Sequence, residues 1–276
     1  MPSISAYDFD VNVKAINTRT RAQRIRAQRQ IEAIRTKYEK VMRPQLRTIF
    51  NQQKNAIIEL ESMDPSEIFL AINSNRALFV KSFSWMYEKV SDDILPMIMP
   101  TERVKSMWSI EKKDPFMDSY IVRRQEYIRD VSGRKITGIN DTTLNMVKEV
   151  MNESDNMIEF RNGVIDVFDN EIKTFRANTI ARTETAYASN NAMYEDTRVI
   201  AEEMGVDLTK TWQVTLDEKV RDTHMHLDGK TIPNDDLYIW DGKSGVVMML
   251  HPLDDSRNAP PEEIINCRCS AFPNII

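Results

Sequence analysis

Apolar side chains recur every three or four positions over residues 17–63, between Arg, Gln and Glu residues. This period is typical of a long amphipathic helix, which Pro44 should bend or break. The sequence Asp64-Pro65-Ser66-Glu67 predicts the start of a second helix, because it supplies an acidic N-cap, a proline at the first helical position and a glutamate at the third. This helix should run to about Ile94 and form an antiparallel hairpin with the first.

The middle of the chain predicts shorter helices with a break between them. One helix should cover residues 115–131 and stop at Ser132-Gly133. An extended segment is expected at 135–139. Either residue of the pair Asn140-Asp141 can then cap a helix that runs to residue 150.

A continuous helical pattern covers residues 171–204, and a helix over 156–168 should lead into it. Gly205 is suited to end this central helix in a left-handed conformation. The middle of one face is small or polar, unlike an aliphatic core. Either another segment approaches closely there and pairs with Arg182 and Glu184, or the helix lies on the surface with both charges solvated. The face comprises Ile172, Phe175, Thr179, Arg182, Ala186, Ser189, Met193 and Ile200.

The pattern changes in the last quarter of the chain. Residues 210–216 alternate between polar and apolar side chains, as a half-buried strand does, and residues 236–240 and 246–250 are further strand candidates. Asp228-Gly229 predicts a tight turn between short extended segments.

These patterns together predict an α+β protein. A long helical N-terminal region and a helix-rich segment precede a small mixed C-terminal domain of short strands and loops. Glycine is scarce, with 7 in the whole chain, which favours long helices before the last third. The predicted segments are an N-terminal arm at 1–13, a long helical hairpin region at 14–100 with a basic start, a connector at 101–142 and the C-terminal domain at 143–276.

Composition and charge narrow the class of protein. The hydrophobic fraction is 41 %, and no apolar run approaches the length that crosses a bilayer, so we expect neither membrane insertion nor a standard secretion signal. The net charge is −5, yet residues 14–47 are strongly basic. Such a segment attracts polyanions, although it could also be a solvated helix in a larger acidic assembly. The basic residues proposed for contact are Arg19, Arg21, Arg24, Arg26, Arg29, Arg35 and Lys37.

Every histidine and cysteine of the chain follows residue 223. Thiolates and imidazoles are zinc ligands, so His224, Cys267 and Cys269, with His226 as a fourth, could hold a structural zinc ion in a loop-rich domain. The alternative is that the thiols are free and the histidine is hydrogen-bonded to a carboxylate beside the central helix. Asp217 should cap the short helical turn that carries His224.

An enzyme can also be drawn from these residues, with Cys267 or Cys269 as nucleophile, His224 as base and Asp228 as the orienting carboxylate. Arg182 and Glu184 would then form an anion clamp. The sequence contains no phosphate-binding glycine loop, nucleophile elbow or metalloprotease helix, so we do not expect an enzyme.

Three blocks of the chain can be read together: Ile180-Ala181-Arg182-Thr183-Glu184 with Ala188 and Asn191-Ala192; Trp212, Asp217, Val220-Arg221, His224 and Leu227-Asp228-Gly229; and Pro261 with Asn266-Cys267-Arg268-Cys269. They resemble the head-morphogenesis family of tailed bacteriophages, the Mu protein F-like minor head proteins. The resemblance extends from about Thr143 to the end of the chain, and the order and spacing of the blocks carry it. No motif of the N-terminal half contributes to it.

The resemblance implies a minor capsid protein of the virion head that acts in assembly near the portal. The expected partners are the portal protein, the major capsid protein and packaged double-stranded DNA, with the basic helix on DNA or on the acidic wall of the portal channel. The alternatives are a zinc-stabilised protein-binding module without DNA contact and a transferase like the toxin-fused relatives of the family. The implied structural cluster is Arg182, Thr183, Glu184, Asn191, Trp212, Arg221, Asp228 and Asn266.

Overall fold

The computed structural model describes residues 20–98, 115–215 and 217–276, and the chain forms two compact units. Unit 1 consists of Met1–Thr36, Lys89–Val122 and Thr183–Ile276, and unit 2 of Lys37–Glu88 and Arg123–Arg182. The segments predicted at 14–100, 101–142 and 143–276 are each divided between the two units. Compactness therefore follows contacts between distant parts of the chain rather than the order of the sequence.

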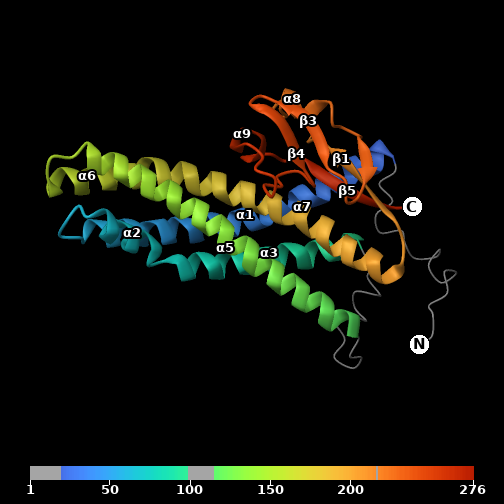
Figure 1. Cartoon of the computed structure of the whole chain (residues 1–276), viewed down its shortest axis with the longest axis horizontal. Coiled ribbons are helices and arrows are strands. Elements are labelled where there is room, and N and C mark those ends of the chain that lie inside the picture. Colours follow the sequence, from blue (N-terminus) through green and yellow to red (C-terminus); the bar gives the residue numbers. More distant parts are fainter. Residues whose placement is uncertain (1–19, 99–114, 216) are drawn as a thin grey trace. The chain divides into compact units, whose positions relative to one another are not determined.

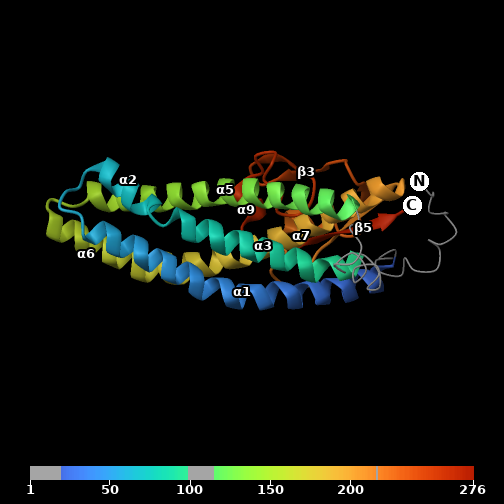
Figure 2. The same ribbon diagram turned by 90° about the horizontal axis from the view of Figure 1, so that it is seen from below.

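The structure confirms the α+β class. Within unit 2, the long helical segments lie side by side (Figures 1 and 2). Across residues 20–98, 115–215 and 217–276, no helix has the length and apolar content needed to cross a membrane. The helices are α1 (Arg21–Ile58), α2 (Pro65–Asn73), α3 (Arg76–Ile98), α5 (Pro115–Asn152), α6 (Met157–Val167), the π-helix η2 (Phe168–Arg176), α7 (Ala177–Met204), α8 (Asp222–Met225) and α9 (Pro261–Ile264).

The first predicted helix is confirmed as α1, and it continues through Pro44 without a break. Met42 and Leu46, on either side of the proline, are completely buried in unit 2, whereas Pro44 itself is exposed. Burial of the flanking side chains offsets the cost of about 3 kcal/mol that a proline imposes inside a helix.

The second predicted helix is divided into α2 and α3. Its predicted start is confirmed, because Oδ1 of Asp64 accepts hydrogen bonds from the backbone N–H groups of Ser66 (2.7 Å) and Glu67 (3.2 Å). The prediction of one helix to Ile94 was wrong. The side chain of Gln53 donates to the Ile72 carbonyl (2.7 Å), and this contact from α1 accompanies the end of α2.

The predicted break between residues 131 and 140 was also wrong, because α5 is one helix from Pro115 to Asn152. Val131, Ile136 and Ile139 are buried at helical spacing in unit 2, and this packing outweighs the cost of about 1 kcal/mol for each glycine in a helix. Asn140 is not a cap. It lies inside α5, where its side-chain amide bonds to Gln53 (3.1 Å).

The central helix consists of η2 followed by α7, and Gly205 ends it with φ +63°, as predicted. The predicted face was partly wrong, because Phe175 is 73 % exposed. The small and polar residues at 183–193 are all buried in unit 1, so α7 is covered on every side there. Other segments therefore do approach this part of the helix.

The predicted strands are present with shifted ends, and β5 and the short helix α9 were missed. In one sheet β1 lies between β2 and β5, and β3 pairs with β4 in the other; all pairs are antiparallel. Figure 1 shows these strands gathered with α8 and α9 in unit 1. The strands are β1 (Leu208–Gln213), β2 (Thr231–Pro233), β3 (Tyr238–Gly242), β4 (Gly245–Met249) and β5 (Ser270–Ile275).

The Asp217 cap was a wrong prediction. Helix α8 begins at Asp222, with Arg221 at the N-cap position and no side-chain cap. The carboxylate of Asp217 instead accepts a hydrogen bond from the Lys219 backbone (2.9 Å) and pairs with Arg268.

Two glycine substitutions test the helix assignments, Gly138 inside α5 and Gly205 after the end of α7. Gly138→Ala should raise the free energy of unfolding by about 0.5–1 kcal/mol, because position 138 is exposed and helical and an added β-carbon would meet no atom within 4 Å. Gly205→Ala should lower it by about 1 kcal/mol, since φ is +63° there. Denaturant unfolding followed by circular dichroism measures both. A destabilising Gly138→Ala would indicate that α5 breaks at residues 135–139.

Candidate metal centre

One histidine and two cysteines meet in the interior of unit 1. His224 comes from α8, and Cys267 and Cys269 come from the segment between α9 and β5. That segment turns sharply, because Asn266 has φ +60° and the Cys267 backbone N–H donates to the Ile264 carbonyl (3.0 Å). Pairing of β5 with β1 then places Cys269 one residue before the sheet.

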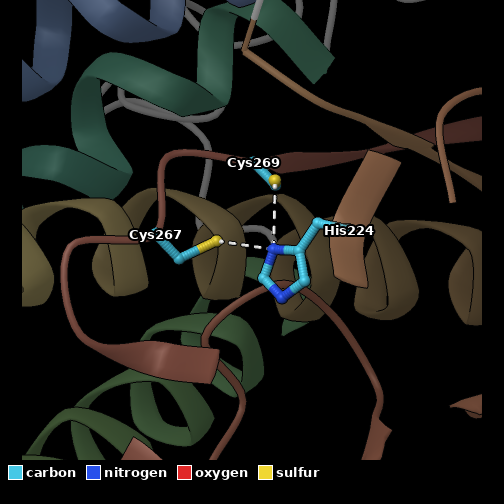
Figure 3. Close-up of side chains that lie close together, drawn as sticks. All are labelled: His224, Cys267 and Cys269. Atoms are coloured by element: carbon cyan, nitrogen blue, oxygen red, sulfur yellow. Dashed lines mark hydrogen bonds between the residues drawn. The ribbon is translucent and has the colours of Figure 1, made fainter. Parts of the chain in front are cut away.

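The ring nitrogen Nδ1 of His224 lies 3.6 Å from the sulfur of Cys267 and 3.6 Å from the sulfur of Cys269 (Figure 3). All three ligand atoms lie within 4.8 Å of one another. The side chains are almost completely shielded, with residue exposures of 1 % for the histidine and 2 % and 3 % for the cysteines. This is a compact group of two sulfurs and one nitrogen.

The other ring nitrogen of His224 faces Glu263, whose Oε2 lies 2.9 Å from Nε2. Glu263 is completely buried, and the Thr223 hydroxyl donates to the same oxygen (2.9 Å). The Nε2 contact is not in line for a hydrogen bond, since Nε2 has no aligned acceptor in the described part of the chain.

Two tryptophans enclose the His224 ring. The ring centroids of Trp212 and Trp240 each lie 5.6 Å from that of His224, edge to face, and both indoles are buried. These aromatic walls lower the local dielectric, which strengthens polar interactions inside the site.

The two thiols differ in acidity. A hydrogen bond with Cys269 lowers the pKa of Cys267 well below its usual range, against the opposing effect of burial. The same bond, with burial, raises the pKa of Cys269 well above its usual range. Cys267 is therefore the first of the pair to become a thiolate, the form that binds metals.

The backbone of the cysteine segment is held from α1. Arg35 is 1 % exposed, and its guanidinium donates to the carbonyls of Arg268 (2.8 Å) and Cys269 (3.3 Å). Gln28 also donates to the Arg268 carbonyl (3.0 Å), and Asn190 of α7 donates to the Cys269 carbonyl (2.9 Å). Sequence reasoning missed this role, because it needs contacts between residues far apart in the chain.

Arg35 is therefore unavailable for the predicted polyanion contact. Its Nε donates to the Ser189 hydroxyl (2.7 Å) and its Nη1 to Glu32 (2.8 Å) in the interior of unit 1. The high density of basic residues over 14–47 suggested an exposed stretch. Helical geometry instead turns position 35 toward the core.

The remaining basic residues differ in position. Arg26, Arg29 and Lys37 are exposed on α1, whereas Arg24 is half-buried and donates to Gln213 (3.1 Å). The side chain of Arg21 is 63 % exposed and lies 3.8 Å from Asp228. Arg19 lies outside the described residues.

Several residues of the predicted cluster border the metal-ligand group. The Thr183 hydroxyl of α7 accepts from the Asn266 backbone N–H (3.0 Å), and Arg221 donates to the Ile265 carbonyl. Asp228 accepts hydrogen bonds from the Gln213 side chain (2.9 Å) and from the backbone N–H of Val214, which directly follows β1 (3.2 Å). These contacts, together with Trp212, connect the histidine turn, the cysteine segment and α7.

Other predicted residues lie elsewhere. Arg182 belongs to unit 2, where its Nε is 3.8 Å from Glu39. Glu184 is buried in α7, and the side chain of Asn191 contacts His251 Nε2 (3.3 Å). An anion clamp of Arg182 and Glu184 has no support from this arrangement.

The predicted fourth ligand was wrong. His226 is exposed and lies outside the ligand group, which within the described ranges comprises His224, Cys267 and Cys269. His251 is buried near Tyr187 and Tyr194, and burial lowers its pKa. It is a core histidine.

The catalytic arrangement considered from the sequence uses Asp228 as the carboxylate that orients His224. The structure places a different carboxylate beside the histidine. Glu263, not Asp228, faces the histidine ring. The pair Glu262-Glu263 follows Pro260-Pro261 in the sequence, but only a tertiary contact distinguishes Glu263 from its neighbour.

Removal of the Arg35 guanidinium should destabilise the protein. Arg35→Ala removes the buried hydrogen bonds to the Ser189 hydroxyl and to the carbonyls of Arg268 and Cys269, and it should lower the free energy of unfolding by about 3 kcal/mol or more. Arg29→Ala, on the exposed face of the same helix, should change it by less than about 0.5 kcal/mol. Urea unfolding followed by tryptophan fluorescence compares the two. Equal effects would contradict the assigned role of Arg35.

Comparison with known proteins gives three results. The family model described as Phage Mu protein F like protein matches residues 139–272. The NAD(+)--arginine ADP-ribosyltransferase EFV of Enterococcus faecalis (strain ATCC 700802 / V583) is 31 % identical over 96 residues, 34 % of this chain and 18 % of that protein. No solved structure matches. The matched segment contains His224, Glu263 and both cysteines, and over this segment the chain is similar to the Phage Mu protein F like family.

Proposed function

We propose that this chain is a minor structural protein of a tailed-bacteriophage head that acts in head assembly. The observation that carries the proposal is the family match over residues 139–272. The shielded group of His224 and the two cysteines lies within that segment and gives it a defined interior. The protein would reside in the virion head, at or near the portal vertex.

The exposed basic face of α1 supports contact with packaged DNA or with an acidic portal surface. Arg26 and Arg29 are three positions apart, so they lie on one side of the helix, and both are exposed. Cations at this spacing can neutralise phosphates or carboxylates of a partner.

Exposed apolar side chains of unit 2 support docking on the portal protein or the major capsid protein. Leu70 of α2 is 66 % exposed, Ile158 of α6 is 71 % exposed and Phe175 of η2 is 73 % exposed. Large apolar side chains at helix surfaces are common at protein interfaces.

The transferase activity named for the Enterococcus faecalis relative is not carried over to this chain. The chain spans 18 % of that protein, and the similarity covers 96 residues. The Arg182 and Glu184 arrangement gives the activity no further support. A binding module without DNA contact is the competing function, and the salt experiment below separates it from the proposal.

The assembly role predicts that purified particles of the phage encoding this chain contain it. Peptide mass spectrometry of the particles should detect it, and loss of its gene should lower the yield of DNA-filled heads. A plasmid copy of the gene should restore the yield. A normal number of filled, infectious heads without the protein would reject the assembly role.

The DNA contact predicts a change in salt dependence. Arg26→Ala/Arg29→Ala should reduce the slope of log affinity for duplex DNA against log salt by about 1.8, at about 0.9 for each phosphate contact. Lys81→Ala/Arg129→Ala, two exposed basic residues of unit 2, removes the same charge and is the control. Full-length protein is used, because α1 supplies core residues to both units. Equal slopes for the two variants, or no DNA binding, would favour the competing binding module.

A further inference from the structure

We propose that His224, Cys267 and Cys269 bind one zinc ion, through Nδ1 and the two sulfurs, and that Glu263 orients the histidine from outside the metal shell. The inference is independent of the proposed role in head assembly. It depends on the distances in the site, on the number of electron pairs that one ring nitrogen offers and on how the cysteine segment is held.

The distances match those of a tetrahedral zinc site. Zinc bonds of about 2.05 Å to nitrogen and about 2.3 Å to sulfur, at a tetrahedral angle, separate the two ligand atoms by about 3.6 Å. Both distances from Nδ1 of His224 to a cysteine sulfur are 3.6 Å. The three ligand atoms lie within 4.8 Å of one another, so an ion can be placed between them once the two sulfurs approach to the roughly 3.8 Å of tetrahedral zinc.

Hydrogen bonding alone does not explain this geometry. A neutral imidazole nitrogen presents either one lone pair or one N–H, so Nδ1 can make one good hydrogen bond with one thiol. Two sulfurs at equal distance from the same nitrogen are better explained by a shared cation. A divalent ion also compensates the two buried thiolates, because the charges sum to zero with a neutral histidine.

The ligand segment is held so that its thiols converge on His224. The Arg268 carbonyl accepts hydrogen bonds from Arg35 and Gln28 of α1. The Cys269 carbonyl accepts from Arg35 and from Asn190 of α7. A backbone fixed from outside leaves the side chains of the cysteines directed at the histidine (Figure 3). Preorganisation of this kind favours metal binding.

Glu263 completes the arrangement as the outer partner. Histidine ligands of zinc usually donate their second ring N–H to a carboxylate, which fixes the ring orientation. The Glu263 carboxylate lies 2.9 Å from Nε2, and Thr223 donates to the same oxygen. This contact leaves Nδ1 of His224 to face the metal.

The fourth coordination position goes to a solvent oxygen. A small recess beside the site is lined in part by the three ligands. No fourth His, Cys, Asp or Glu atom joins the ligand group in the described part of the chain. Zinc with three protein ligands commonly takes water as the fourth. The remaining lining residues are Thr215, Lys219, Val220, Arg221, Asn266 and Arg268.

Metal content of the purified full chain tests the proposal. Under reducing conditions, elemental analysis should give about one zinc per folded chain, and Cys267→Ser/Cys269→Ser should reduce it to background. His226→Ala is the matched control, since this exposed histidine lies outside the ligand group, and should keep the zinc. Zinc retained in the double variant would overturn the proposal.

Cobalt and a Glu263 variant keep the test independent of whether the cysteine variant folds. Cobalt(II) added to the metal-free wild-type chain should give thiolate charge-transfer absorption and the intense visible bands of a tetrahedral site. Glu263→Gln should weaken zinc affinity about 10- to 100-fold in competition with a chromophoric chelator, while His226→Ala leaves it unchanged. A folded, reduced wild-type chain that takes up neither zinc nor cobalt overturns the proposal, and an unchanged affinity in Glu263→Gln overturns the role of the carboxylate.

Discussion

The buried guanidinium of Arg35 joins α1, α7 and the cysteine segment within unit 1. It donates to the Ser189 hydroxyl of α7, to the carbonyls of Arg268 and Cys269 and to the Ser270 hydroxyl at the start of β5. A buried cation is costly unless every donor is used, so this position demands a specific arrangement of the surrounding backbone. The geometry of the thiol pair, and therefore of the whole ligand group, depends on it.

This arrangement changes how the basic helix is understood. Residues 21–36 of α1 belong to the same compact unit as the C-terminal strands, so this part of the helix is a component of the domain core. Its face toward the core carries Ile31 and Arg35, whereas Arg26 and Arg29 lie on the opposite, exposed face. One helix therefore contributes to the stability of unit 1 and also presents the cations proposed to contact a polyanion.

The small sheets explain why so many polar side chains are buried. A sheet of three short strands and a two-stranded hairpin bury limited apolar surface, and Trp212 and Tyr238 supply much of the core between them. Buried hydrogen bonds such as those of Asn190 connect the sheet to α7. A zinc ion bound by His224 and the two cysteines would connect the α8 turn to the segment between α9 and β5, which both lie outside the strands.

The sequence by itself determined the α+β class, the cap at Asp64, the end of the central helix at Gly205 and the candidate ligands His224, Cys267 and Cys269. These features depend on residue type and on contacts within a few residues, which local pattern reports directly. Only the tertiary structure decided that α5 continues through its glycines, that Arg35 is interior and that Glu263 faces the histidine. Each of these outcomes comes from packing between segments far apart in the chain, where burial and hydrogen bonding outweigh local preference.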